Sequence, residues 1–306
     1  MNVTEIIDLA REEVLDDTKV PYLWKTTGLI FFLNEALNEF CRETWIITDQ
    51  TTAAVTQIKL LSNLGIYPLD ERVLNIKSAR FLNTNDGTWP LSKKSEAYLD
   101  ASYSNWRATT GTPKAYCPDA EAKSLSIYPK YDTDGEVIGA SNITFTAATK
   151  KISKPGASFT TAFPIGTEFR VSGTTSNDGY FTVANVADTE ITVNEVLVNE
   201  GPVSAVLRKV RNTLLMVVNR LPLTSLTPAD YGAVVPVVPE IKSLYHGGLI
   251  YGIGKFAFAK PDTDTFDKAR SEQYRVLFEL VKARAKADVL RLQAYDQTNP
   301  ARLGNT

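Results

Sequence analysis

The chain has 306 residues, of which 43% are hydrophobic and 22% are charged, as in an ordinary globular protein of one or two domains. Its formal net charge of −2 argues against a protein that coats nucleic acid by bulk electrostatic attraction. No apolar run approaches the roughly 18 residues that a membrane-spanning helix needs. The acidic start MNVTEIIDLAREEV lacks the basic residues and unbroken apolar stretch of a signal peptide, so we expect a cytosolic chain with no membrane partner.

Apolar spacing predicts two helices near the N-terminus. The first is expected over residues 3–15, with Asn2 and Glu5 forming a capping box. The second is expected to begin after Thr26 or Thr27 and to run to about Trp45. Cys41 lies on this helix and is predicted to be a buried thiol, whereas Cys117 is expected in a loop. Because the chain has no CxxC motif, neither a disulfide framework nor a zinc site is predicted.

Residues 50–130 change to an alternating pattern that predicts short strands, with one short helix in WPLSKKSEAYLDASYSNW. The segment SLSIYPK reads as a strand, and so does NTLLMVVNRLPL much later in the chain. We expect these two strands to pair as a hairpin whose tip carries the intervening residues, since exposed hairpin tips tolerate insertions.

Residues 136–209 are predicted to form a compact β module. The turn Asn177-Asp178-Gly179 indicates a hairpin, because these residue types tolerate positive φ. Short strands so close together suggest a small barrel or a sandwich. The expected strands lie near Ile143–Ala147, Lys151–Ser153, Glu168–Ser172, Tyr180–Val183, Ile191–Asn194 and Val203–Leu207.

The last third of the chain is predicted to be helical. One helix is expected to begin at Pro239 and Glu240, and Gly248 and Gly252 on one of its faces would let another helix approach closely. After Pro261, Asp262 or Thr263 is expected to cap a second, long helix. Its apolar stripe comprises Tyr274, Leu277, Phe278, Val281, Ala285, Val289 and Leu292.

The predicted fold class is therefore α+β, with terminal helices that form a bundle beside a small β region and with an inserted all-β barrel or sandwich. The expected domains are a discontinuous one over residues 1–135 and 210–306, which includes the β hairpin, and an inserted one over residues 136–209. The polar residues 294–306 are expected to be a flexible C-terminal tail.

Nothing in the sequence indicates an enzyme or a cofactor. His246 is the one histidine, so a Ser-His-Asp or Cys-His set depends on it, and its helical setting favours a structural or interface role. GLIYGIGK is not a P-loop, because Phe256 follows the lysine and the segment lies in a helical pattern.

Acidic and basic clusters also have plain structural interpretations. Asp178, Asp188, Glu190 and Glu195 lack calcium-loop spacing, so turn and surface roles are favoured over a metal site. Arg270, Arg275, Lys282 and Lys286 alternate with acids on the last helix, which is typical of a solvated face. Contact with a partner or with passing DNA is the alternative, here and at Arg208, Lys209 and Arg211.

The loop PADYGAVVPVVPE is apolar yet does not fit regular structure. Packing within the chain is one explanation, and docking on a neighbouring subunit is the other. The residues that we select as a candidate subunit interface are Tyr231, Val234, Val235, Val237 and Val238.

Several segments, in the same order, resemble the head-to-tail adaptor proteins of tailed bacteriophages. They are VPYLWKTTGLIFFLNEALNEFCRE, YPLDERVLNIKSARF, SNWRATTGTPKAYCPD, LSIYPK, LLMVVNRLPL and VPEIKSLYHGGLIYGIGKFAFAKPDTDTFDKA. The resemblance covers residues 1–132 and 210–285. Residues 136–209 depart from the simpler family members and resemble small β modules of other phage structural proteins.

The resemblance implies a non-enzymatic virion protein at the head–tail junction, assembled in the host cytoplasm. It implies a ring that is dodecameric, like the portal, and that binds below the portal protein. On its other side the ring would meet a tail or nozzle protein. The ring would continue the DNA channel and make nonspecific contact with the passing duplex. It also implies that a C-terminal segment reaches into the portal. In this chain the candidate portal-binding residues are Ala294, Tyr295, Asn299, Pro300, Arg302 and Leu303.

A different interpretation makes the β module a surface- or carbohydrate-binding part of a virion. Exposed aromatic side chains on one β face would favour it. The candidates are Phe159, Phe163, Phe169, Tyr180 and Phe181, although strand alternation predicts that most of them face the core of the module.

Overall fold

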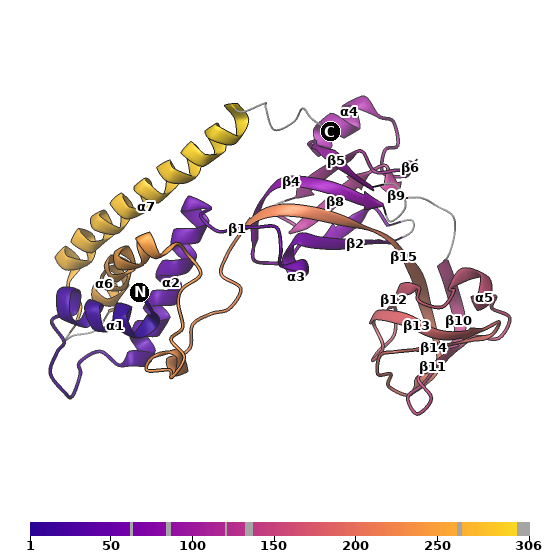
Figure 1. Cartoon of the computed structure of the whole chain (residues 1–306), viewed down its shortest axis with the longest axis horizontal. Coiled ribbons are helices and arrows are strands. Elements are labelled where there is room, and N and C mark those ends of the chain that lie inside the picture. The colour runs from indigo at the N-terminus through magenta and orange to yellow at the C-terminus, as the bar shows by residue number, and fades with distance from the viewer. Residues whose placement is uncertain (62–63, 84–86, 120, 132–136, 262–264, 299–306) are drawn as a thin grey trace. The chain divides into compact units, whose positions relative to one another are not determined.

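The computed structural model describes the chain except for residues 62–63, 84–86, 120, 132–136, 262–264 and 299–306 (Figure 1). It divides into two compact units. The helical unit comprises Met1–Asp49, Glu71–Asn75 and the chain from Val218 onward, and the β unit comprises Gln50–Asp70 and Ile76–Val217. The mixed α+β class predicted from the sequence is confirmed.

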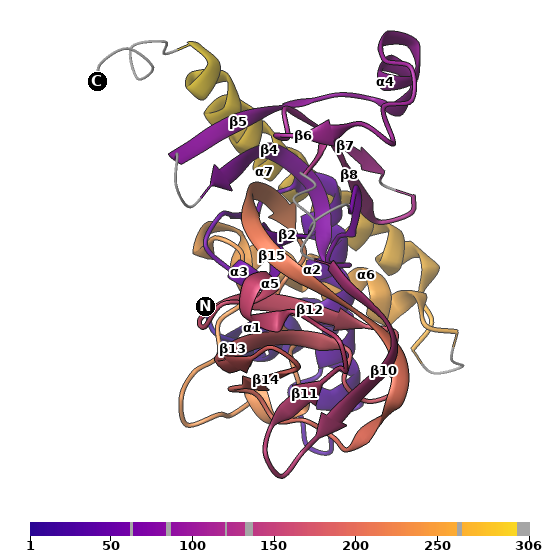
Figure 2. The same ribbon diagram turned by 90° about the vertical axis from the view of Figure 1, so that its right-hand side faces the viewer.

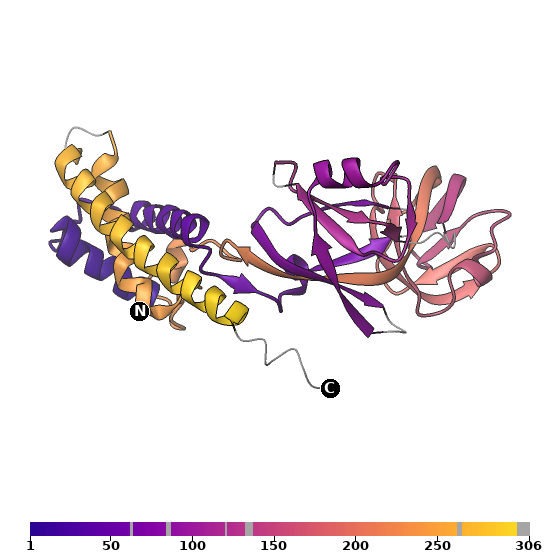
Figure 3. The ribbon, with the colours of Figure 1, turned by 90° about the horizontal axis from the view of Figure 1, so that it is seen from above.

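The helical unit is built from both ends of the sequence. Its N-terminal elements are α1 (Val3–Ala10), the π-helix η1 (Arg11–Leu15), α2 (Thr26–Thr44) and the short strand β1 (Thr48–Asp49). Its later elements are the 3₁₀ helices η2 (Pro228–Asp230) and η3 (Ser243–Gly248), and the helices α6 (Leu249–Ala259) and α7 (Lys268–Thr298). Helix α6 packs against α1, α2 and α7, which run close to one another in Figure 3.

The two predicted N-terminal helices are confirmed. Asn2 and Glu5 form the expected capping box on α1, because each side chain accepts a hydrogen bond from the backbone of the other residue. The continuation of α1 is a single π-helical turn, and α2 ends at Trp45, which has positive φ. Cys41 is fully buried in α2, as predicted.

The C-terminal helices begin later than the sequence indicated. Pro239 and Glu240 precede the first helical turn of η3, and regular α-helix begins only at Leu249. Asp267 caps α7, since its Oδ1 accepts the backbone N–H of Arg270 at 3.0 Å, whereas the expected caps Asp262 and Thr263 lie outside the described residues. Helix α7 continues through Thr298, so the first residues of the predicted flexible tail are helical.

Glycines allow the close helix packing that was predicted. A Cβ atom on Gly252 would lie 2.5 Å from the Cβ of Ala36 in α2 and 3.2 Å from Phe278 in α7. A Cβ on Gly248 would lie 2.5 Å from the side chain of Val281. Gly254 has the same role against Val14 of η1, although its spacing did not predict this contact.

The β unit contains a closed barrel of six antiparallel strands (Figure 2). The ring is closed because β10 pairs with both β11 and β15. The strands follow the order β10 (Val137–Thr146), β11 (Lys151–Ser153), β14 (Glu190–Val193), β13 (Gly179–Ala187), β12 (Glu168–Ser172) and β15 (Glu200–Arg220). All six predicted strands are present, and the barrel alternative is the one observed.

The predicted hairpin between SLSIYPK and NTLLMVVNRLPL is wrong. The first segment is β8 (Ser124–Tyr128), which pairs with β7 (Ala115–Asp119) and β3 (Ile66–Pro68). The second segment is the far half of β15, and its antiparallel partners are β1 and β2 (Gln57–Leu61). Alternation identified both strands, but it carries no information about which edges pair.

Strand β15 contains two segments that were predicted as separate strands. Its first half belongs to the barrel and its second half to the central strands. Ala205 and Leu207 are buried in the first half, whereas Leu214 and Met216 are buried in the second. The register shift between Val210 and Asn212 accounts for this change from odd to even positions, because a β-bulge moves side chains to the other face.

The remaining elements complete the central part of the β unit. Strand β4 (Val73–Asn83) lies between β15 and β5 (Gly87–Lys93), and β5 pairs in parallel with β7. Cys117 lies buried in β7 rather than in the predicted loop. The short elements are α3 (Ala53–Thr56), α4 (Glu96–Ser102), β6 (Thr110–Gly111), β9 (Lys130–Tyr131) and α5 (Phe159–Ala162).

Candidate interaction surfaces

The apolar loop over residues 221–240 is closed at its base by an ionic cluster in which Arg220 and Asp49 are buried. Arg220 donates from Nε to Asp49 Oδ2 at 2.6 Å and from Nη1 to Glu240 Oε2 at 2.9 Å. The same Glu240 oxygen accepts the backbone N–H of Leu223 at 2.7 Å. One carboxylate therefore holds both ends of the loop together, and loss of Arg220 would also remove the ion pair of the buried Asp49.

The loop is also fixed along its length to the N-terminal helices. Asn34 of α2 donates to the carbonyl of Leu226 at 2.8 Å and accepts its N–H at 2.9 Å. The hydroxyl of Tyr231 donates to Asp8 Oδ1 at 2.8 Å, and Thr4 Oγ1 accepts the N–H of Gly232 at 2.9 Å. These contacts hold the loop in one conformation against α1 and α2.

The five residues selected as a candidate subunit interface fall into two groups. Tyr231 and Val237 pack against the core of the helical unit, and the carbonyl of Val237 accepts the N–H of Val3 at 2.9 Å. Val234 is 100% exposed, Val235 77% and Val238 53%. Three valines are thus exposed to solvent on a loop whose backbone is hydrogen-bonded to α1 and α2.

Only part of the candidate portal-binding set falls within the described residues. Ala294 and Tyr295 lie on the last turns of α7. Asn299, Pro300, Arg302 and Leu303 lie outside the described residues. Their portal-binding role stays a prediction.

The predicted environment of one charged residue on the last helix is wrong. Lys282 was expected on a solvated face, but it is only 3% exposed, because α7 turns it toward α2. Its Nζ lies 2.7 Å from Glu39, 2.8 Å from Glu43 and 2.7 Å from Glu279. Burial by itself lowers the pKa of Lys282, but the hydrogen bonds to these three carboxylates outweigh burial and raise it. The carboxylates would otherwise suit a cation, and the ammonium group of Lys282 contacts all three and offsets part of their charge.

His246 has the structural role that was predicted. It is fully buried, its Nε2 lies 2.9 Å from the carbonyl oxygen of Ile241, and its Nδ1 lies 2.8 Å from the carbonyl oxygen of Met1.

The acidic side chains of the barrel also have hydrogen-bond partners within the chain. Asp178 accepts two hydrogen bonds from Thr174, which confirms its turn role.

The remaining acids of the barrel also have local partners. Asp188 accepts a hydrogen bond from the hydroxyl of Thr160, and Glu190 pairs with Lys151 at 2.6 Å. Glu195 accepts the backbone N–H of Thr182 at 2.9 Å. These contacts agree with the predicted surface roles.

The barrel does not present the aromatic face that carbohydrate binding would favour. Of the five candidate aromatic residues, only Tyr180 is exposed. The four others fill the barrel core, where the rings of Phe163 and Phe169 lie 5.1 Å apart. The alternation argument is confirmed, and it weakens the alternative of a carbohydrate-binding module.

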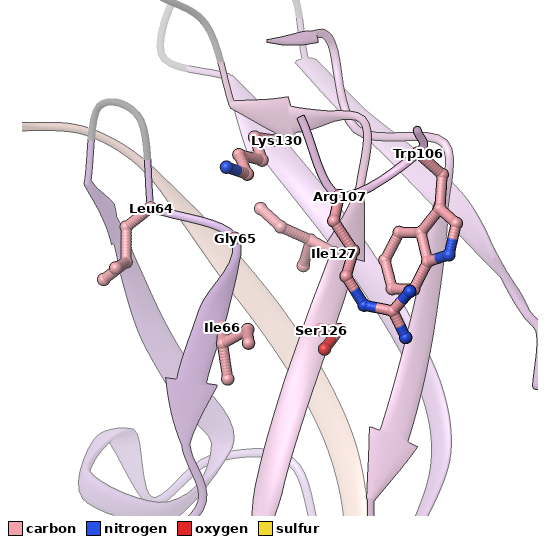
Figure 4. A pocket seen from close by; sticks show the side chains of 8 residues that line it. All are labelled: Leu64, Gly65, Ile66, Trp106, Arg107, Ser126, Ile127 and Lys130. Atoms are coloured by element: carbon pink, nitrogen blue, oxygen red, sulfur yellow. The ribbon is translucent and has the colours of Figure 1, made fainter. Parts of the chain in front are cut away.

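A cavity of about 290 Å³ lies in the central part of the β unit (Figure 4). Its walls are mainly apolar, with Trp106 and Ile127 beside the polar groups of Arg107, Ser126 and Lys130. Arg107 is engaged by Asp100, which accepts its Nη1 at 2.7 Å and the Nε1 of Trp106 at 2.7 Å. The cavity therefore combines mainly apolar walls with the guanidinium of Arg107, one hydroxyl group (Ser126) and one ammonium group (Lys130).

The described part of the chain contains no helix with both the length and the apolar character needed to cross a bilayer. Among curated proteins, none matches the sequence. The model of the SU10 adaptor protein family matches residues 1–304, which is nearly the whole chain. The family implies contacts with other virion proteins and a structural, non-catalytic role. The chain thus belongs to the SU10 adaptor protein family, a family of phage head–tail adaptors.

Proposed function

We propose that this phage adaptor forms a ring that binds below the portal and joins the capsid to the tail while continuing the DNA channel. The observation that carries the proposal is the family match over residues 1–304, which includes the helical unit, the barrel and the C-terminal helix together. The proposed partners are the portal protein, a tail or nozzle protein and further copies of the chain. The proposed site of action is the head–tail junction, after assembly in the host cytoplasm.

The C-terminal segment is proposed to bind the portal. Helix α7 carries Ala294 and Tyr295 out to residues 299–306, which are rich in polar residues. A segment that orders on its partner gives up conformational entropy at that moment, so it binds in a way that depends on assembly. The ring is proposed to match the portal in subunit number, which makes it a dodecamer.

Passing DNA calls for weak contact rather than a tight grip. A protein that neutralises many phosphates binds DNA strongly, and the affinity grows with each Lys or Arg contact. The formal net charge of −2 supports a channel with little such affinity. The barrel is proposed to act as an inserted module over residues 136–209 that contacts another virion protein.

Native mass spectrometry of the full chain, alone and with the portal ring of the same phage, tests the proposal. We expect single copies in isolation and, with the portal, complexes that hold one adaptor per portal subunit. Replacing residues 299–306 by a Gly-Ser sequence of the same length should abolish the complex but leave the fold intact. If the unaltered chain does not bind the portal, the proposal is wrong.

A further inference from the structure

Helix α7 has a second apolar stripe that nothing in the described structure covers. It consists of Val276, Leu280, Ala283, Ala287 and Leu290, all of them exposed. Val276 is 46% exposed, and Leu280 and Leu290 are each 56% exposed. Successive members are four, three, four and three residues apart, which is the heptad spacing of a helix that packs against a partner along its length.

This stripe lies on the side of α7 opposite to its packed side. Phe278, Lys282 and Ala285 are buried against the rest of the helical unit. At about 100° per residue, their mean direction points about 150° away from the exposed stripe. The helix is therefore apolar on two opposite sides, and only one of them is used within the chain.

Basic side chains follow one edge of the exposed stripe. Arg284 and Arg291 lie on this edge seven residues apart, which is about 10 Å along the helix, and both are exposed. Arg291 also lies 3.9 Å from Asp288. The other edge carries Glu272 and Glu279 together with Lys286, so positive charge predominates on the first edge alone.

The same unit carries a surface of the opposite sign. Glu5, Asp8 and Glu12 are exposed on the side of α1 and η1 that faces away from the core, and Glu5 and Glu12 are also seven residues apart. The anchored loop lies against this side through the contact of Tyr231 with Asp8. Its exposed Val234 and Val235 add apolar area beside the acids.

We propose that the exposed stripe of α7 in one copy docks onto the acidic, valine-bearing surface of the next copy. The occupant is a second copy because one helical unit carries both complementary surfaces, with matching charge spacing. A contact between two different surfaces is heterologous and generates a ring when its rotation closes. The inference rests on the proposed function, since it names the subunit contact of the proposed ring.

Pairing of α7 with the α7 of another copy is disfavoured by charge. In an antiparallel pair of helices, the residues along one edge of the contact face the same edge of the partner helix. Arg284 of one copy would therefore lie beside Arg291 of the other. Like charges so placed repel. The acidic surface of α1 removes this repulsion.

Charge reversal tests the proposed contact between copies and does not require the identification of another ligand. One variant carries Arg284→Glu with Arg291→Glu, and the other carries Glu5→Lys with Glu12→Lys. Because Glu5 also accepts the N–H of Asn2 in the α1 capping box, recovery of rings in a mixture of the two variants is the decisive result. Each variant alone should lose at least tenfold in the occupancy of complete rings on the portal, measured by native mass spectrometry. An equal mixture should recover rings of alternating composition, since every contact in such a ring again joins opposite charges.

An apolar substitution on α7 has a matched control. Leu280→Ser should reduce complete rings severalfold, whereas Leu292→Ser, on a side chain that is 55% exposed but off the stripe, should not. Circular dichroism should show both variants folded, because neither side chain is buried. Rings that form equally well with all four variants would overturn the inference, and so would a mixture that assembles no better than its components.

The failures of the two proposals can be distinguished. If the unaltered chain does not bind the portal at all, the proposed function fails. If it forms complete rings that neither charge reversal nor Leu280→Ser affects, the proposed function stands and the inferred subunit contact is wrong.

Discussion

In the helical unit, residues 1–49 pack against residues from 218 onward, whereas the barrel is closed by strands from one continuous stretch between β10 and β15. The polar contacts of the two regions differ in the same way, in the sequence distance that they span. Glu39 of α2 accepts hydrogen bonds from Lys255 and Lys282, which are more than two hundred residues away. In the barrel, Glu200 accepts the N–H groups of Thr175 and Ser176 and holds a nearby turn. Long-range ion pairs thus join the ends of the chain in one region, and local hydrogen bonds close turns in the other.

The largest expected effects come from two aromatic truncations, each of which should destabilise one region. Phe169→Ala empties the barrel core and Phe278→Ala empties the helical core, and each should cost about 4 kcal/mol, since both rings are fully buried. Hydrogen exchange followed by mass spectrometry should accelerate in the barrel strands for the first variant and in α2, α6 and α7 for the second. Acceleration of the same segments in both variants would show that the two cores are not separate.

Lys282→Ala should be the next most damaging change. It leaves three clustered carboxylates without their buried cation, which should cost about 3 kcal/mol in the free energy of unfolding. Lys286→Ala, an exposed lysine on the same helix, should change stability by less than about 0.5 kcal/mol. Urea titration measures both, and equal losses would contradict the role given to the cluster.

A pair of glycine substitutions tests the close packing of α6. Gly252→Ala places a methyl group 2.5 Å from Ala36 and should cost about 1–3 kcal/mol through overpacking. Gly28→Ala in α2 meets no atom within 4 Å and should instead stabilise the protein by about 0.5–1 kcal/mol. Thermal unfolding should therefore shift in opposite directions, and a shared direction would refute the packing argument.

The smallest expected effect concerns acid. Burial by itself raises the pKa of Glu39, but the hydrogen bonds to Lys255 and Lys282 outweigh it and hold the pKa below its usual 4.5. A lowered folded-state pKa means that stability from this group is present above pH 4.5 and is lost as the pH falls through the folded-state value. Glu39→Gln should flatten the loss of stability below pH 4.5 in urea titrations at several pH values. An unchanged acid slope would show that Glu39 is not coupled to its lysines.

The sequence predicted the parts whose signal is local. The limits of α2, the capping box at Asn2, the six barrel strands and the glycine contacts of α6 all follow from periodicity, turn chemistry or residue size. The pairing of β15 with β2 could not be predicted, because alternation identifies strands but not their neighbours.

The candidate surfaces show the same limit. The loop valines were selected because they fit no regular element, but only the structure separates the packed Val237 from the exposed Val234 and Val235. The second stripe of α7 did have a signal in its heptad spacing. It was not predicted, because one core-facing stripe is enough to account for a helix that packs within its own chain. The burial of Lys282 had no local signal, since its partners lie mainly on α2.

The most direct measurement is a cryo-electron microscopy reconstruction of the head–tail junction in intact particles of the phage that encodes this chain. We predict density for the chain as a ring between the portal and the tail, with residues 299–306 against the portal. Density for this chain elsewhere in the particle, or a junction without it, would contradict the proposed function.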